Sequence, residues 1–292
     1  MLIRSEFDIQ FQLPAPITML AMLDLHPSVD ALAREVTPLV VEHVDGGQMS
    51  RLVTEKYQDT YGNRCSRVHL PAGAVRLSGS NVVEIDGMPD LVNVDAQQAE
   101  VRDLPAAVLP FLLASRYCEV DRMCGLACDL FGSVPKGWLL AVTIRDWVHD
   151  HVRFDYNSAR PTKTALDLFT ERVGVCRDFQ HLAITLTRAM NLPARYVAGY
   201  LGDIRSPYAG PGDFSAWYEV FLDGRWWTMD ARHNHPRIGR VLMATGRDAT
   251  DVAITTTFGI ANLTHFYVES NEVDGDGNLI LPPGHPEIPI AA

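Results

Sequence analysis

One cysteine lies at the predicted start of a helix, where a thiol can become reactive. Cys176 follows the apolar approach of residues 173–175 and precedes a segment whose large apolar residues recur at helical spacing. A thiol in the first turn of a helix lies beside free backbone amides and the positive end of the helix dipole, which both favour the thiolate. Cys176 is therefore a candidate nucleophile. The alternative is a packing role, because free cysteine is among the residue types most often buried in cores.

A predicted β-hairpin supplies the polar groups that such a nucleophile needs. The Asp-Gly pair at residues 223–224 is a strong signal for a two-residue turn between strands at residues 214–222 and 225–230. With this turn, Ser215 and Asp230 point to one side of the ladder as diagonal neighbours, about 7–8 Å apart between their Cβ atoms. A cysteine nucleophile is usually activated by an imidazole that a third polar group orients. Asp230 could orient a histidine at position 215, but the serine there is too short to replace the ring.

Three other histidines are candidates for the missing base. His181 lies about 140° around the helix from Cys176 and therefore faces elsewhere. The hairpin register places Arg232 opposite position 215, and it places His233 on the other side of the ladder unless the strand ends before that residue. His235 precedes a proline in an irregular stretch and cannot be placed. The sequence therefore does not favour any of the three as a replacement.

Two changes of periodicity organise the rest of the chain. Residues 1–103 contain short alternating runs separated by turn residues, which predicts an N-terminal β-sandwich domain. After them the apolar spacing becomes helical, and strand-like alternation returns at residues 194–201. The Gly- and Pro-rich loop at residues 206–212 is long and irregular enough to border a site. We expect a second domain over residues 104–292 that carries Cys176.

The composition excludes several classes of function. The 292 residues carry a net charge of −11 and no basic run, so we expect no nucleic-acid partner and no binding to an anionic membrane surface. No apolar stretch is long enough to span a membrane and none resembles a signal peptide, which predicts a cytoplasmic protein.

The cysteines indicate reduced thiols and no metal site. The chain has five of them, an odd number that fits free thiols better than a disulfide framework. Cys118, Cys124 and Cys128 lie in one segment, but their spacing matches no common zinc motif. We expect these three to pack into a helical core.

Four segments together resemble the bacterial transglutaminase-like cysteine proteases. They are GVCRDF (174–179), LPARYVAGY (192–200), AWYEV (216–220) and GRWWTMDARHN (224–234). Their combined order and spacing are more specific than any one segment, and the β-rich start resembles the N-terminal domain that accompanies this family. The resemblance implies an α+β fold with a papain-like core. In such a core a cysteine on a helix attacks an amide carbonyl, a histidine on a strand transfers protons, and an aspartate orients the histidine.

The resemblance assigns roles to three residues. Cys176 matches the nucleophile and Asp230 matches the orienting aspartate, while Ser215 occupies the position of the family's histidine. It implies a peptide or protein amide as substrate, and it implies no cofactor and no metal. We assign Trp217 and Tyr200 as candidate substrate contacts.

Several alternatives stay open at this stage. The chain is either a cysteine peptidase or amidase whose activity Ser215 reduces or abolishes, or a non-catalytic protein that binds peptides in the same groove. A third possibility is that Ser215 was introduced to silence an active parent protein. Trp226 and Trp227 must face opposite sides of their strand, so at least one of them packs in the core. The sequence sets neither the substrate, nor hydrolysis against acyl transfer, nor the oligomeric state.

Overall fold

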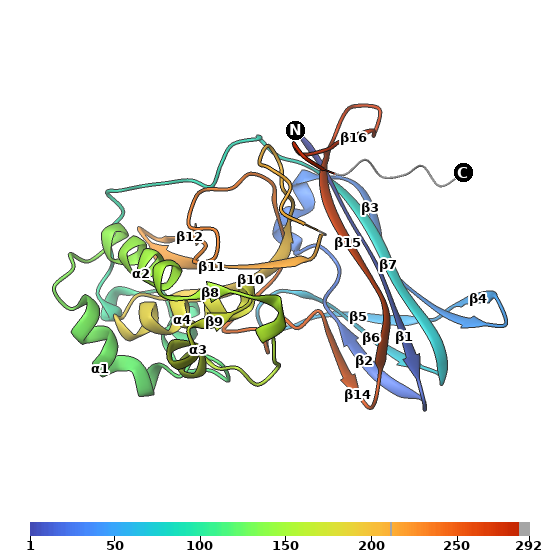
Figure 1. Ribbon diagram of the computed structural model, residues 1–292, viewed down its shortest axis with the longest axis horizontal. Coiled ribbons are helices and arrows are strands. Elements are labelled where there is room, and N and C mark those ends of the chain that lie inside the picture. Colours follow the sequence, from blue (N-terminus) through green and yellow to red (C-terminus); the bar gives the residue numbers. More distant parts are fainter. Residues whose placement is uncertain (211, 286–292) are drawn as a thin grey trace.

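The computed structural model describes residues 1–210 and 212–285, so residues 286–292 of the predicted second domain lie outside the described part. Sheets form one side of the molecule and helices the other (Figure 1). The strands are β1 (Leu2–Leu13), β2 (Ile17–Ala21), β3 (Ala33–Asp45), β4 (Gln48–Arg51), β5 (Thr54–Gln58), β6 (Arg64–Leu70), β7 (Gly73–Glu84), β8 (Arg153–Phe154), β9 (Val173–Gly174), β10 (Ala194–Leu201), β11 (Phe214–Leu222), β12 (Arg225–Met229), β13 (Arg240–Gly246), β14 (Thr255–Phe258), β15 (Asn262–Val273) and β16 (Leu279–Ile280). The α-helices are α1 (Val120–Phe131), α2 (Trp138–His151), α3 (Ala165–Glu171) and α4 (Cys176–Ala189), and short 3-10 helices lie at Pro27–Leu32, Val101–Asp103, Ala106–Leu112 and Tyr156–Ser158.

Two sheets make up the β-rich body. Their strand orders are β16-β15-β1-β7-β3-β4 and β14-β2-β6-β5. Alternate residues of β1 are buried, and the apolar ones among them join side chains of β2, β6 and β7 in one shared core. Strands from both ends of the chain build these sheets, because β14 pairs with β2 and β15 pairs with β1, while β16 pairs with β15 at the edge. The mixed α/β architecture agrees with the predicted class, whereas the more specific β-sandwich stays a prediction.

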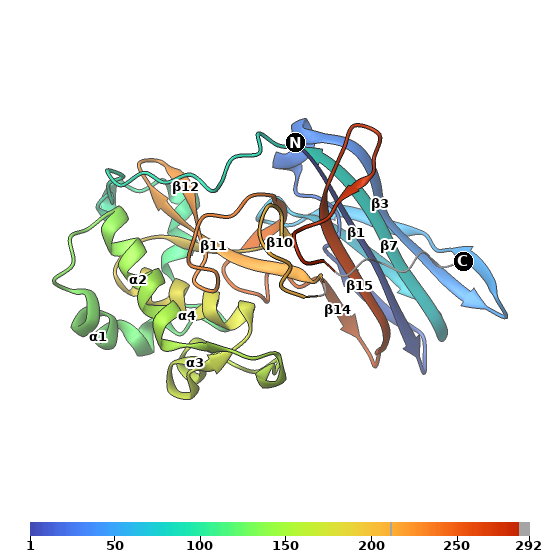
Figure 2. The same cartoon turned by 45° about the horizontal axis from the view of Figure 1, so that its top comes forward.

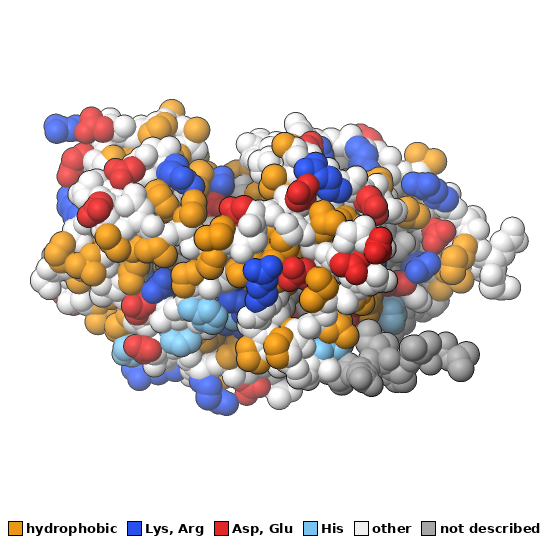
Figure 3. Space-filling view, turned by 90° about the horizontal axis from the view of Figure 1, so that it is seen from above, with side chains coloured by type: hydrophobic (Ala, Val, Ile, Leu, Met, Phe, Trp, Pro, Cys, Tyr) orange, Lys and Arg blue, Asp and Glu red, His pale blue; other side chains and the backbone are white. Residues whose placement is uncertain are grey.

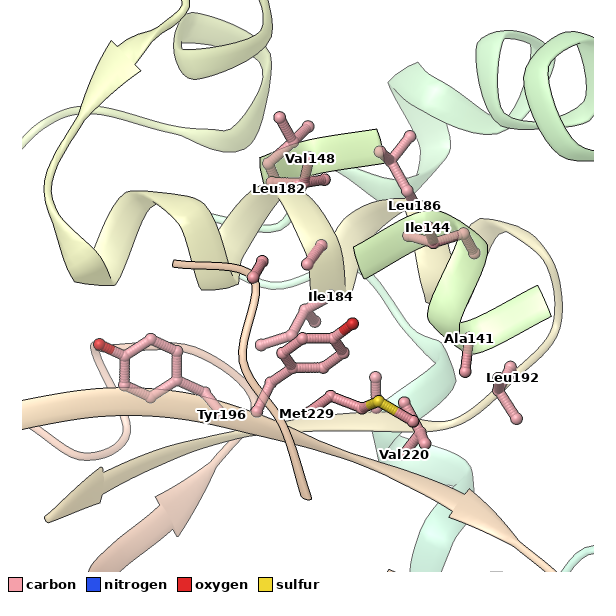
Figure 4. Close-up of a cluster of buried hydrophobic side chains, with 14 of the residues drawn as sticks. Ala141, Ile144, Val148, Leu182, Ile184, Leu186, Leu192, Tyr196, Val220 and Met229 are labelled. Atoms are coloured by element: carbon pink, nitrogen blue, oxygen red, sulfur yellow. The ribbon is translucent and has the colours of Figure 1, made fainter. Parts of the chain in front are cut away.

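The second body places α4 between three helices and a sheet. The sheet has the order β12-β11-β10-β13, and α4 contacts it on one face (Figure 2). Every residue of α4 from 178 to 188 is buried, including polar side chains such as Gln180, His181 and Arg188. Side chains of α2, α4 and the sheet meet in the core drawn in Figure 4, where Ile144, Leu182 and Val220 are among the labelled residues.

The β11–β12 hairpin has the predicted register. Leu222 pairs with Arg225 across the turn, and the ladder continues to the pair of Tyr218 with Met229. Both turn residues, Asp223 and Gly224, have positive φ angles of 47° and 74°, as this two-residue turn requires. The turn chemistry therefore fixes which side chains of the two strands share a face.

The two bodies share side chains where β13 approaches the β-rich core. Val241 and Met243 on β13 are buried among the apolar residues of that core. The Asn63 side chain donates to the Thr245 carbonyl at 2.9 Å and accepts from the Thr245 N–H at 2.8 Å, so it pairs with β13 as another strand would. Across the described residues, no helix has the length and apolar character that a membrane crossing demands.

Candidate active site

The start of α4 is built around Gly174 and Asp178. A Cβ atom at position 174 would lie 2.6 Å from Leu168 Cδ1 and 2.9 Å from Asp178 Cβ, so glycine is needed for β9 to pass this close to the helix. The Asp178 carboxylate accepts a hydrogen bond from the Val175 N–H at 3.1 Å, which holds the first turn. Cys176 is the first residue of the helix, and this prediction is confirmed.

The Cys176 thiol is half-buried and protonated at neutral pH. Burial raises its pKa to about 11; Arg232 opposes this shift, whereas the Asp213 and Asp230 carboxylates add to it. The backbone N–H of Arg177 at the helix start favours the thiolate, as expected, but burial of the sulfur raises the pKa by more. The thiol needs a proton acceptor before it can attack a carbonyl carbon.

Gln180 connects the helix face that carries Cys176 to the strands beside it. It lies one helical turn after Cys176, so the two side chains project from the same face of α4. Its Nε2 donates to the Ala216 carbonyl at 3.3 Å and to Asp230 Oδ1 at 3.2 Å, and its Oε1 accepts from the Ala231 N–H at 3.2 Å. A fully buried amide thus holds the nucleophile's helix face against the Asp230 carboxylate.

Asp230 directly follows β12 and is 4% exposed. Its Oδ1 accepts the backbone N–H groups of Arg232 at 3.0 Å and His233 at 3.1 Å. Its Oδ2 accepts from Arg240 Nη2 at 3.0 Å and lies 2.8 Å from His233 Nδ1. Burial disfavours the ionised carboxyl, but Arg240 and His233 outweigh burial and hold the pKa of Asp230 well below its usual range. Asp230 is therefore a fixed anion that faces an imidazole.

This imidazole was not expected, and it arises where the ladder ends. β12 stops at Met229, and the Asn234 N–H donates to the Asp230 carbonyl at 2.9 Å, so the chain enters a helical turn. The register predicted His233 on the other side of the ladder unless the strand ended before that residue, and β12 does end before it, at Met229. The physical reason is Asp230 itself, because its carboxylate caps the two backbone N–H groups that open the turn.

Ser215 lies on β11 and lines a cavity of about 100 Å³. Because the ladder has ended, Arg232 does not pair with Ser215 as the register predicted. Instead Arg232, His233 and Asp213 line the same cavity as Ser215. The Gly- and Pro-rich loop at residues 206–212 contributes four of its described residues to the wall, which confirms that this loop borders a cavity of the site.

The chain matches known proteins in both sequence and structure. The family described as the Transglutaminase-like superfamily matches residues 133–231. Over 208 residues the chain is 32% identical to "Uncharacterized protein ML0607" from Mycobacterium leprae (strain TN), which covers 68% of this chain and 73% of that protein. The chain belongs to the transglutaminase-like superfamily. The crystal structure of a candidate cysteine protease from Cytophaga hutchinsonii is also similar, with a TM-score of 0.80 and 29% sequence identity over 96% of this chain and 93% of that one.

The transglutaminase-like match contains only part of the residues around Asp230. It runs from the approach to α2 to just beyond β12, so Cys176, Ser215 and Asp230 all lie within it. His233 and Arg240 lie beyond its end. The sequence names His233 only as one of three candidate bases, and it gives no signal that His233 and Arg240 bind Asp230 Oδ2.

Arg240 ties Asp230 to the linker that follows β7. Its Nη2 binds Asp230, and its Nε lies 3.0 and 2.9 Å from the two carboxylate oxygens of Asp90. Asp90 also accepts the Arg237 N–H at 2.9 Å and donates its own N–H to the Arg237 carbonyl at 2.9 Å. No local sequence signal marks this bridge, because its members are far apart along the chain.

The other two histidines contact different groups. His181 is fully buried, accepts the Ala249 N–H at Nε2 at 3.1 Å and stacks on Tyr117 with ring centroids 4.8 Å apart. Burial lowers its pKa to about 3, so the ring is neutral. His235 is exposed, and its Nδ1 lies 2.7 Å from the His233 carbonyl oxygen. The prediction that His181 faces away from the nucleophile is confirmed by these contacts.

The two candidate substrate contacts, Tyr200 and Trp217, are both buried, so their assignment stays a prediction that this burial does not support. Tyr200 is 0% exposed and packs against Phe214 in the β-rich core, with ring centroids 5.3 Å apart. Trp217 is 3% exposed, and the Arg240 guanidinium lies over its ring at 5.0 Å. Both rings are therefore almost completely covered by other parts of the protein.

The adjacent tryptophans of β12 face opposite sides, as predicted. Trp227 is buried in the helical core and makes an edge-to-face contact with Trp138, with ring centroids 5.7 Å apart. Trp226 packs on the other side of the strand against Phe221. Both rings therefore serve packing.

The prediction for the cysteine cluster holds for one residue of three. Cys118 is buried in the helical core, whereas Cys124 and Cys128 are exposed. The buried face of α1 carries Met123 and Ala127 instead, and residues one position further along point outward. Within residues 1–210 and 212–285, no group of three His, Cys, Asp or Glu side chains is placed to hold a metal ion.

Acidic and basic side chains are interspersed on the surface. On the face shown in Figure 3, Lys and Arg alternate with Asp and Glu, and they do not gather into one basic patch. Elsewhere among the described residues, exposed charges form ion pairs, such as Arg67 with Glu55 and Arg160 with Glu171. This face therefore lacks the concentrated positive charge that a polyanion partner requires.

Proposed function

We propose that this chain is a transglutaminase-like cysteine peptidase or amidase that uses Cys176 as the nucleophile toward a peptide or protein amide. One observation carries the proposal. Gln180 joins the helix face of Cys176 to Asp230, so the superfamily's nucleophile and aspartate positions meet at one site. The Cytophaga hutchinsonii relative, a candidate cysteine protease, supports the same class of chemistry.

The reaction follows from thiol chemistry. The deprotonated sulfur adds to the amide carbonyl carbon, the C–N bond breaks, and an acyl-thioester remains on Cys176. Water or an amine then releases the acyl group. Cys176 lies in the first turn of α4, beside backbone N–H groups, and we expect these groups to stabilise the negative charge that develops on the carbonyl oxygen.

A second candidate function is peptide binding without catalysis. Two observations favour it: serine replaces histidine at position 215, and the pKa of Cys176 is raised to about 11. Under this alternative the chain keeps the groove of an enzyme, and Cys176 forms no covalent intermediate.

Acylation of Cys176 separates the two functions. We expect para-nitrophenyl acetate to acetylate Cys176 and to be turned over, and we expect fluorescein-labelled casein to be cleaved by the wild-type chain but not by Cys176→Ala. Peptide mapping by mass spectrometry identifies the acetylated residue, with the exposed Cys124 and Cys128 as thiols of ordinary reactivity in the same sample. Acetylation of Cys176 no faster than that of Cys124 and Cys128, together with intact casein, would establish the binding function instead.

A further inference from the structure

We infer that His233, held by Asp230, performs the proton transfers that a histidine at position 215 performs elsewhere in the superfamily. The inference rests on the proposed function, because it concerns the base that serves Cys176. It relocates the imidazole from a strand to the turn that follows the next strand.

The first support is the hydrogen-bond pattern of Asp230. Backbone N–H groups and Gln180 occupy Oδ1, so Oδ2 is the oxygen that faces side chains, and it binds His233 Nδ1 at 2.8 Å. Arg240 binds the same oxygen at 3.0 Å and keeps the carboxylate ionised. An ionised carboxylate only accepts hydrogen bonds, so the ring hydrogen lies on Nδ1 and Nε2 carries a free lone pair. A general base of a cysteine enzyme needs this tautomer.

The second support is where the ring lies. His233 is half-buried and lines the cavity of about 100 Å³ that Ser215 also lines. In the described part of the chain, no group forms a hydrogen bond with His233 Nε2, so this nitrogen is available to a ligand. An imidazole at position 215 would fill part of this space; serine leaves room for a water, which takes about 30 Å³ of liquid volume.

The third support links this cavity to the thiol. Gln180, one turn after Cys176 on the same helix face, binds the carbonyl of Ala216, the residue next to Ser215. Within the described residues no hydrogen bond joins Sγ to the His233 ring directly. We therefore assign the transfer to one water that rests against Ser215 and bridges Sγ to Nε2, a path that general-base catalysis tolerates.

The proton balance closes with this residue alone. Nε2 takes the thiol proton through the bridging water, Sγ bonds to the carbonyl carbon, and the imidazolium returns the proton to the leaving nitrogen as the C–N bond breaks. A second water then gives a proton to Nε2 while its hydroxide adds to the thioester carbon. The C–S bond breaks, and the sulfur recovers the proton. No oxidant, reductant or metal takes part.

A purely structural role for His233 is the competing explanation. The ring also caps the turn at residues 230–234, and a cap needs only a donor at the position of Nδ1. His233→Asn keeps a donor for Asp230 and removes the group that accepts and returns the proton. His235→Asn is the matched control, since this exposed histidine lies two residues away in the same segment.

The test measures steady-state turnover of para-nitrophenyl acetate from neutral pH to pH 11 in the full chain, with thermal unfolding as a check on folding. We expect His233→Asn to lose about 10²–10⁴-fold near neutral pH, the usual cost of removing a general base, and to approach wild-type turnover as hydroxide replaces the base near pH 11. His235→Asn should stay within about twofold of wild type, because the His235 side chain is exposed and its Nδ1 lies at the His233 carbonyl oxygen and not at Asp230. Adding Ser215→His to His233→Asn should restore turnover by supplying a second imidazole.

The outcomes separate this inference from the proposed function. Cys176-dependent turnover that His233→Asn leaves within about twofold would overturn the inference and leave the proposed function standing. Turnover that appears only after Ser215→His, and never in the wild-type chain, would overturn both the inference and the activity proposed for this chain. The same pH-dependent loss in His235→Asn as in His233→Asn would also contradict the inference, because the effect would then belong to the segment and not to the ring held by Asp230.

Discussion

Position 215 on β11 and the turn after β12 both border the same cavity of about 100 Å³, but they are held in different ways. Ser215 belongs to a strand that pairs on both sides, so its direction is set by the ladder. His233 belongs to a short turn whose shape depends on one capping carboxylate, that of Asp230. Position 215 on the strand carries no imidazole, whereas the turn carries His233. An aspartate whose carboxylate is fixed can therefore orient a histidine that lies either on the neighbouring strand or in the turn after its own strand.

Asp230 is the residue that both positions depend on, so changing it should have the largest effect. Asp230→Ala removes the acceptor that orients His233 and leaves the Arg240 guanidinium without one of its two carboxylates. We expect turnover to fall by about 10⁴-fold, the loss typical of an unoriented histidine, and stability to fall by about 3–5 kcal/mol because a buried ion pair is broken. Turnover of the acetyl ester and urea unfolding measure the two effects. An active, equally stable variant would show that the turn does not need its cap.

Ser215→His should add an imidazole on the strand that competes with His233 of the turn as the proton acceptor. The cavity of about 100 Å³ beside residue 215 accommodates an imidazole, so the variant should fold normally. Two rings then compete for Asp230, and we expect turnover to rise by about tenfold or more, within the range that a positioned base contributes. Ser215→Asn, which has a similar length but no titratable group, is the control. Equal turnover in the two variants would mean that position 215 no longer faces the nucleophile.

Arg240→Gln tests whether the carboxylate shared by the two positions must stay ionised. The folded pKa of Asp230 is depressed, so its ionisation adds stability that is fully present above the ordinary value of 3.8 and is lost as the pH falls through the folded value. We therefore expect the free energy of unfolding of the variant at neutral pH to fall by about 3–5 kcal/mol, as for a broken buried ion pair. When the pH is lowered from neutral to acid, the variant should lose less further stability than the wild-type chain. Urea unfolding at neutral pH and below pH 3.8 measures both. Arg205→Gln, which breaks an exposed pair with Glu272, is the control.

Tyr200→Phe should have the smallest effect, because this ring lies away from both positions. The Tyr200 hydroxyl is buried with no hydrogen-bond partner, so removing it relieves a desolvated polar group. We expect turnover within about twofold of wild type and stability that is unchanged or about 1 kcal/mol higher. A large loss of turnover with normal unfolding would instead support the prediction that Tyr200 contacts the substrate.

The sequence predicts the parts of this site that local chemistry determines. The Asp-Gly turn sets the β11–β12 register, and Gly174 with its following polar residues sets the start of α4 at Cys176. Both follow from signals within a few residues. The position of β15 beside β1 does not, since their pairing joins the two ends of the chain.

Two features of the site lie beyond sequence reasoning for a physical reason. β12 ends where the Asp230 carboxylate accepts hydrogen bonds from the backbone N–H groups of Arg232 and His233, which then no longer pair with β11. The alternation of apolar and polar residues does not predict this local hydrogen bonding. The protonated state of Cys176 depends on how much protein covers the sulfur, which is a tertiary property. The sequence therefore predicts Cys176 and Asp230 as members of one site, but it does not predict that His233 binds Asp230.

The pH dependence of Cys176 alkylation shows most directly whether His233 accepts the proton of the Cys176 thiol. Iodoacetamide labelling, followed peptide by peptide with Cys124 and Cys128 as exposed references, compares the wild-type chain with His233→Asn. We predict that the alkylation rate of wild-type Cys176 rises well below pH 11 and that this rise depends on His233. In the variant, the alkylation rate should rise only near the thiol's own pKa of about 11. A single rise near pH 11 in both proteins would contradict the account, because Cys176 would then have no histidine partner.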